Sequence, residues 1–270
     1  MVTQPAMCNT HHAPRITHQA SGSRDAELDA RGIHYRDLNA RLRGLANGDA
    51  GARVTIRNVC GQRYIGTGLR CPVEIHVHGT PGNDLGAFMD GPRITVHGNA
   101  QDGCGNTLNS GQVIIHGRAG DILGYSMRGG RILVRDSVGY RAGIHMKACG
   151  DRQPTIVIGG TAQPFLGEYM AGGVVLVLGL NLGPGERHHA DHIGTGMHGG
   201  VIYLRGAVEP WQLGREVGTA ALDAADWERV RALVADYARH FRADAEAILA
   251  APFTRLFPLY LRPYGNLYAY

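Results

Sequence analysis

The chain has 270 residues, 44% of them apolar and 19% charged, with a net charge of +4 and five cysteines. This composition supports a buried core, and so mild a charge argues against a nucleic-acid-binding protein. No run of 18 apolar residues and no N-terminal secretory signal are present, and no Cys-x-x-Cys pair occurs, so we expect no membrane span, no cysteine-bound metal and a cytoplasmic location.

Residues 1–51 form a polar N-terminal arm that we expect to be partly disordered. Within it, residues 25–46 are consistent with either a short helix or a pair of strands. Asn47-Gly-Asp then predicts a turn before the next segment.

Residues 52–218 are built from a repeat in which a glycine is followed three residues later by methionine. Successive copies are 19, 19, 19, 24 and 27 residues apart, and a period near 20 residues indicates a repeat architecture. Five of the seven methionines occupy this position, which predicts that they stack in one interior column. The copies begin at Gly86, Gly105 (with leucine in place of methionine), Gly124, Gly143, Gly167 and Gly194.

A short aliphatic run accompanies each copy, as in Ile75-His-Val77 and Ile132-Leu-Val134. One strand per coil of 19–27 residues leaves no room for a crossover helix, so each strand must pair in parallel with its predecessor. The sequence therefore predicts an all-β protein, a right-handed parallel β-helix. A left-handed β-helix acyltransferase would need a six-residue period, which is absent.

The second position of each run should point outward, because side chains alternate along a strand. This position is polar in His76 and Thr95 and then becomes large and apolar, which predicts that another surface covers it. The cover is the C-terminal helix, a second polypeptide of an assembly, or both together, and we predict an interface at Ile114, Leu133, Ile156, Leu176 and Tyr203.

Residues 219–270 are predicted to form a C-terminal amphipathic helix and an aromatic tail. Apolar residues from Leu222 to Ile248 recur at helical spacing, Asp223 or Thr219 could cap the helix, and Pro252 should end it. Such a helix commonly covers an open end or a flank of a solenoid.

Candidate catalytic groups are few. His188-His-Ala-Asp-His192 could form a metal site or an acid–base pair, but no second ligand cluster accompanies it at a defined spacing. His78, His97 and His116 should stack in one outward column. Loop arginines could gather into a basic stripe for a polyanion, although scattered solvated charge is the simpler interpretation. The loop arginines are Arg118, Arg128, Arg131, Arg135, Arg141 and Arg152.

From these candidates we expect no catalytic residue, no metal site and no directly bound cofactor on this chain.

The repeated Gly-x-x-Met, glycine pair and aliphatic run resemble the GXGXG repeat domains of glutamate synthase large subunits and of the C subunit of formylmethanofuran dehydrogenase. Asp244-Ala-Glu-Ala-Ile-Leu249 and Phe253-Thr-Arg-Leu-Phe-Pro258 resemble both, and the ending Arg262-Pro-Tyr-Gly-Asn-Leu-Tyr268 is closer to the dehydrogenase subunit. The resemblance covers about residues 50–268 and carries no catalytic residue onto this chain.

The resemblance implies a structural subunit of a formyltransferase/hydrolase complex of methylotrophic bacteria, in tetrahydromethanopterin-linked formaldehyde oxidation. That complex transfers formyl to a methanofuran-type carrier and hydrolyses it to formate. The implied partners are amidohydrolase-like, formyltransferase and dehydrogenase-B-like subunits, without nucleic acid. The alternatives are the C subunit of a tungsten or molybdenum formylmethanofuran dehydrogenase, a glutamate-synthase-like bridging module, or a free-standing enzyme that uses His188, His189 or His192.

Overall fold

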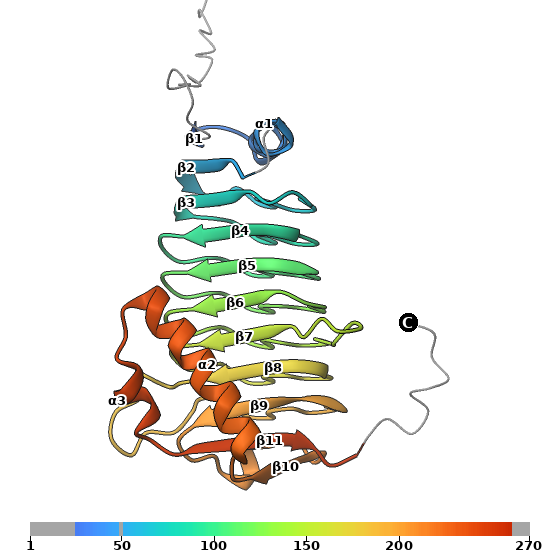
Figure 1. The fold of residues 1–270 in the computed structure, drawn as a ribbon, viewed down its shortest axis with the longest axis vertical. Helices are drawn as coiled ribbons and strands as arrows, with labels where there is room; N and C mark the ends of the chain where they lie inside the picture. The colour runs from blue at the N-terminus through green and yellow to red at the C-terminus, as the bar shows by residue number, and fades with distance from the viewer. Residues whose placement is uncertain (1–24, 49–50, 261–270) are drawn as a thin grey trace, which may run out of the picture.

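The computed structural model describes residues 25–48 and 51–260, and its strands form one sheet in the order β1-β2-β3-β4-β5-β6-β7-β8-β9-β11-β10 (Figure 1). Strands β1 to β9 pair in parallel, each with the next along the chain, so the predicted all-β parallel β-helix is confirmed. The strands are β1 Asp25–Asp29, β2 Arg53–Cys60, β3 Glu74–Thr80, β4 Asp90–Val96, β5 Ser110–Ile115, β6 Arg131–Val134, β7 Thr155–Ile158, β8 Ala171–Val177, β9 Gly199–Arg205, β10 Val217–Ala220 and β11 Phe253–Pro258. The helices are α1 Tyr35–Gly48, α2 Ala224–Phe241, α3 Ala245–Leu249 and the 3-10 helix η1 Pro210–Gln212.

The strands stack in register, so equivalent side chains of successive coils lie above one another. Two columns point inward and form the core of the solenoid. In the first of these, every side chain is 0% exposed: Ile75, Ile94, Val113, Ile132, Ile156, Val175 and Ile202. The predicted methionine column is confirmed as well, because Met89, Met127, Met146, Met170 and Met197 are at most 1% exposed.

The repeated glycines lie on a second face, where the backbone alternates between left-handed and right-handed residues. In one coil, Ile122, Gly124 and Ser126 have φ values of 51°, 65° and 52°. Ile122 and Ser126 donate N–H bonds forward to the carbonyls of Tyr140 and Ile144, whereas Gly124 donates back to Cys104. The face is therefore a ladder between coils, which satisfies backbone groups that a buried turn would otherwise leave unpaired.

The central residue of this ladder must be glycine for a second reason. A Cβ on Gly124 would lie 2.6 Å from Cδ1 of Ile156, inside the core. Both the positive φ and this close approach exclude a side chain. The same arrangement recurs at Gly105 and Gly167, where a Cβ would meet the core isoleucines Ile132 and Ile202.

Strand β1 and helix α1 lie at the N-terminal end of the solenoid. Strand β1 pairs in parallel with β2, and Leu38 and Leu42 of α1 are buried in the solenoid core. Asn39 fixes the helix by donating to the carbonyls of Tyr35 and Arg63 at 2.8 and 2.9 Å. The end of the core is thus covered by α1. The expected disorder of the first residues lies outside the described part of the chain.

The C-terminal segment folds as two helices and a strand, where the sequence predicted one helix. Asp223 caps α2 as predicted, since its carboxylate accepts the N–H of Asp226 at 2.8 Å. Arg242 adopts a left-handed conformation (φ 56°), which ends α2 before α3 begins. Strand β11 then pairs antiparallel with β9. The aromatic tail was predicted from Phe253 onward, but its first residues form β11, because Phe253 and Leu256 pack into the apolar clusters. From residue 261 onward the predicted tail lies outside the described residues, and the segment boundaries at 51/52 and 218/219 stay predictions.

Candidate functional site

The outward column of the strands is covered by the chain's own helix α2, which crosses the coils diagonally (Figure 1). Leu133, Leu176 and Tyr203 are 0% exposed and pack in one cluster with α2. The facing side chains of the helix are Val230, Leu233, Val234 and Tyr237. Of the two covers that the sequence left open, the helix is the one in this structure. A contact of this column with another subunit stays a prediction and would require α2 to move.

One residue of the predicted interface was assigned to the wrong face. Ile156 pairs with Ile132 and lies in the core, while its neighbour Val157 pairs with Leu133 and belongs to the outward column. The physical reason is that Thr155 to Ile158 is a run of four β-branched residues, in which polarity does not alternate. Such a run cannot fix its own register.

Tyr203 anchors α2 through a buried polar contact. Its hydroxyl donates to Oδ1 of Asp226 at 2.6 Å and accepts from Arg229 at 3.0 Å. Burial, together with the bond to Asp226, raises the pKa of Tyr203 to about 12. Arg255 of β11 also reaches Asp226, at 3.3 Å. The start of α2 is therefore locked onto both β9 and β11.

A groove runs along one side of α2, where the strands begin. Two cavities of about 460 and 540 Å³ share Arg131, Gln153 and Thr155 and together form it. We call it the arginine groove, since its charged lining is Arg93, Arg131, Arg229 and Arg239. The opposite side of α2, where the strands end, has a separate cavity of about 520 Å³, whose lining includes Arg118, Arg135 and Tyr237.

The loop arginines proposed from the sequence do not form one stripe. Arg131 lies in the arginine groove, whereas Arg118 and Arg135 line the cavity across the helix. Arg141 is on the ladder face, where it binds Glu168 at 3.0 Å and lies over the ring of Phe165. The arginines that do gather are the four that line the arginine groove. The sequence did not predict this group, because Arg229 and Arg239 belong to α2, which is distant in sequence from Arg93 and Arg131.

The predicted histidine column is confirmed as a stack. Ring centroids of His78 and His97 are 4.4 Å apart, and those of His97 and His116 are 5.6 Å apart. His76 joins them, with its Nδ1 3.0 Å from Nε2 of His97. Partial burial and the neighbouring histidines lower the pKa of His97 to about 4. Phe241 at the end of α2 contacts His116 edge-on, so the stack meets the helix there.

The cluster His188 to His192 is not brought together as a site. His188 is 4% exposed and its Nε2 is bound to the carbonyl of Arg205 at 2.8 Å, which holds the loop against β9. His192 instead stacks on Phe165 at the surface. Gln212, also buried, donates to the carbonyls of His188 and Ala190. These contacts are those of a loop anchor.

The ladder face presents aromatic side chains to solvent. Tyr125, His145 and Tyr169 form a continuous row of ring contacts across three coils. Phe88 and Tyr169 are 53% and 47% exposed, which is unusual for large aromatic groups. His145 and Tyr169 each lie two residues after a repeat glycine, as does Phe88, whereas Tyr125 directly follows Gly124. The repeat thus carried a signal for part of this row, which the glycine and methionine pattern alone did not indicate.

Metal clusters and membrane spans are two further features that would bear on function. Within the described residues, no three histidine, cysteine or acidic side chains are grouped as metal ligands would be. None of the helices in that part of the chain has the length and apolarity needed to cross a bilayer. Four surface features of residues 25–48 and 51–260 are candidates for function, namely the arginine groove, the cavity across α2, the histidine stack and the aromatic row.

The fold defines a class of protein. It is a parallel β-helix in which residues of left-handed conformation alternate around a glycine in each coil. The family model of the GXGXG motif matches residues 43–262, and the chain belongs to that family. An uncharacterized protein of Methanocaldococcus jannaschii, MJ1350, is 42% identical over 254 residues, which cover 92% of this chain and 97% of that protein.

A solved structure also has this fold. It is the crystal structure of the formyltransferase/hydrolase complex (FhcABCD) from Methylorubrum extorquens with methylofuran, in which one chain matches with a TM-score of 0.59 and 19% identity. The match covers 92% of this chain and 96% of that chain. The likeness to this complex, which the repeat predicted, is thus confirmed at the level of the fold.

Proposed function

We propose that the chain is a non-catalytic structural subunit of a cytoplasmic formyltransferase/hydrolase complex. The observation that supports this proposal is the match in fold, which covers 92% of this chain and 96% of one chain of such a complex. The geometry supports a structural role, because the candidate catalytic histidines are loop anchors and stacked surface groups rather than one site.

In this proposal, chemistry takes place on the partner subunits. A formyltransferase subunit would take formyl from a tetrahydromethanopterin carrier, and an amidohydrolase-like subunit would release formate. A dehydrogenase-B-like protein would complete the assembly. This chain would hold them in place through its exposed faces without binding the methanofuran-type carrier itself, as part of one-carbon oxidation in a methylotroph.

A second candidate is favoured by one observation. The identity to the Methanocaldococcus jannaschii protein is 42%, against 19% for the chain of the bacterial complex. This difference supports an assembly other than the bacterial one. The C subunit of a tungsten or molybdenum formylmethanofuran dehydrogenase and a glutamate-synthase-like bridging module are the two alternatives, and both keep the chain as a scaffold.

Purification of the chain from its native source under mild conditions distinguishes these proposals. Mass spectrometry should identify amidohydrolase-like and formyltransferase-like subunits in stoichiometric amounts. Recovery of a tungsten or molybdenum protein, or of a glutamine amidotransferase, would favour the second candidate instead. A native chain that elutes alone, zinc-loaded and active would contradict a scaffold role.

A further inference from the structure

The arginine groove has more positive charge than its own carboxylates neutralise. Asp236 is bound by both Arg131 and Arg239, so one carboxylate serves two guanidinium groups. Arg93 donates to Nε2 of His240 at 3.3 Å, and Arg229 donates to the hydroxyl of Tyr203 at 3.0 Å. Burial lowers the pKa of His240 and raises that of Tyr203 to about 12, and both shifts favour the neutral form of the acceptor. Arg229 also lies near the carboxylate of Asp226, but that carboxylate already binds Arg255 at 3.3 Å. The groove therefore retains excess cationic donors.

The groove is long rather than compact. Arg93, Gln112, Arg131 and Thr155 occupy one outward column of successive strands, directly beside α2. Coils stack about 4.8 Å apart, so Arg93 and Arg131 are separated by about 10 Å along the axis. Because its two cavities share Arg131, Gln153 and Thr155, the groove continues past Arg131 toward Val174, Val201 and Arg229.

The terminal segments of the chain do not supply the missing negative charge. Residues 1–24 and 261–270 contain no aspartate and no glutamate. These two segments therefore provide no acidic side chain for the groove. Amide and hydroxyl groups of Gln112, Gln153 and Thr155 lie between the arginines and could bind a peptide backbone.

We propose that the arginine groove binds an extended acidic segment of a partner polypeptide. Guanidinium groups bind carboxylates in bidentate geometry, which matches an arginine lining better than a lysine one. An extended chain presents side chains of one face at intervals of about 7 Å, which suits cationic groups spread along an axis. A compact anion would fill only one part of the groove.

Fluorescence anisotropy with the full-length chain tests this proposal. The probe is a labelled peptide of alternating glutamate and serine, and the matched control peptide has glutamine in place of glutamate. The glutamate peptide should bind, with an affinity that falls as salt is raised. Arg93→Gln and Arg229→Gln should each weaken binding by about tenfold, the value expected for loss of one charge-assisted hydrogen bond.

Arg118→Gln is the matched control variant, because it removes an arginine from the cavity on the other side of α2 and should leave binding unchanged. Melting temperatures of all variants confirm folding. The proposal is overturned if both groove variants bind like the wild type, or if the glutamine peptide binds equally well. Displacement of the peptide by millimolar orthophosphate would mean a compact anion site, and tighter binding of oligothymidylate would mean a nucleic-acid groove, so either result also overturns it. The assay uses the isolated chain, and its outcome is independent of which complex co-purifies.

Discussion

Stacked histidines give this protein a pH-sensitive surface. His97 lies between the rings of His78 and His116, next to His76, and partial burial and these neighbours lower its pKa to about 4. The pKa values of His78 and His116 are also lowered, chiefly by burial. In the unfolded chain a histidine has a pKa near 6.5. At pH values between about 4 and 6.5, the folded protein therefore binds fewer protons than the unfolded protein.

It follows that stability should fall as the pH is lowered from about 6.5 to 4, because the unfolded state gains protons that the stack rejects. Solvent screening limits the effect, since His97 is exposed. Melting temperatures of the wild type and of His97→Gln, measured across this range, should differ in slope, with the variant less sensitive. Parallel curves would show that the carboxylates alone cause the loss.

Helix α2 stabilises the fold mainly through its apolar face. Its cluster with the outward column includes Leu133, Val157, Leu176 and Tyr203, all 0% exposed. Uncovering such a column would expose contiguous apolar surface, which favours association. The helix thus covers a surface of the solenoid that the coils themselves leave apolar.

Leu133→Asp should detach α2 while leaving the coil interior intact, because the new carboxylate would be buried without a partner. We expect a loss of about 3–5 kcal/mol in the free energy of unfolding. Proteolysis within residues 224–241 should become faster. Ala235→Asp is the control, since Ala235 is exposed on the same helix and its substitution should be nearly neutral. Unchanged melting of Leu133→Asp would show that α2 does not depend on this face.

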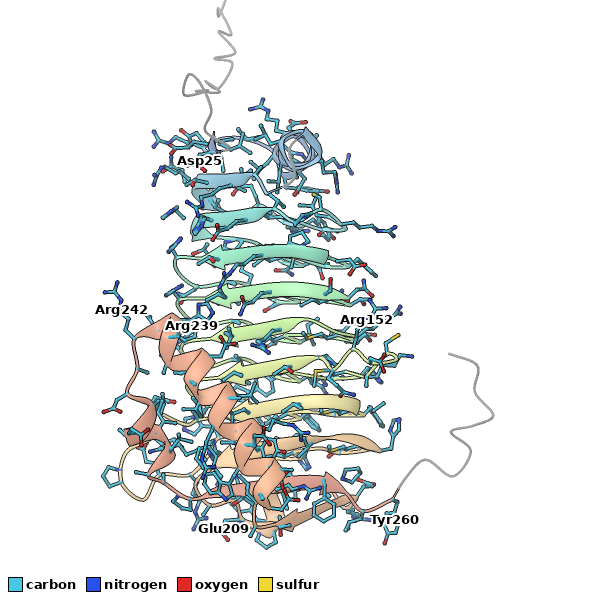
Figure 2. The ribbon with its side chains drawn as sticks, viewed as in Figure 1. Asp25, Arg152, Glu209, Arg239, Arg242 and Tyr260 are labelled. Carbon is cyan, nitrogen blue, oxygen red and sulfur yellow. The ribbon has the colours of Figure 1, made fainter. Side chains whose placement is uncertain are left out.

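The described residues form a column of coils in which each strand pairs with its neighbours, and Figure 2 shows side chains projecting from the coils along this column. Stability along such a solenoid is close to a sum of local terms. Coils β5 to β9 have α2 as an additional layer, because residues from Ile114 to Tyr203 belong to the helix cluster. Coils β2 to β4 contribute no residue to that cluster.

Hydrogen exchange should therefore be graded along the axis. Amides of β6 to β8 should exchange more slowly than those of β2 and β3, because opening the former also requires α2 to leave. Mass spectrometry of peptic fragments measures this directly, and Leu133→Asp should reduce the difference. Equal protection of β2 and β3 and of β6 to β8 would mean that the solenoid unfolds as a single unit.

The sequence by itself determined the features that depend on local periodicity. The period near 20 residues required parallel coils, and alternation along each strand placed Ile75 and Val77 inside. The sequence also narrowed the start of α2 to two candidate caps, one of which, Asp223, caps it in the structure. Glycine positions followed from the need for positive φ at the turns. Each of these properties is fixed by residues a few positions apart.

Only the tertiary structure decided which surface covers the outward column, since a helix and a second subunit would satisfy the same apolar pattern. It also decided the face of Ile156, because an unbroken β-branched run leaves register to the neighbouring coils. The arginine groove arose in the same way, from residues such as Arg93 and Arg239 that are 146 positions apart in the printed sequence. The physical reason is that these contacts join segments that are distant in the sequence. Their relative placement depends on how the coils stack, and no local sequence pattern encodes it.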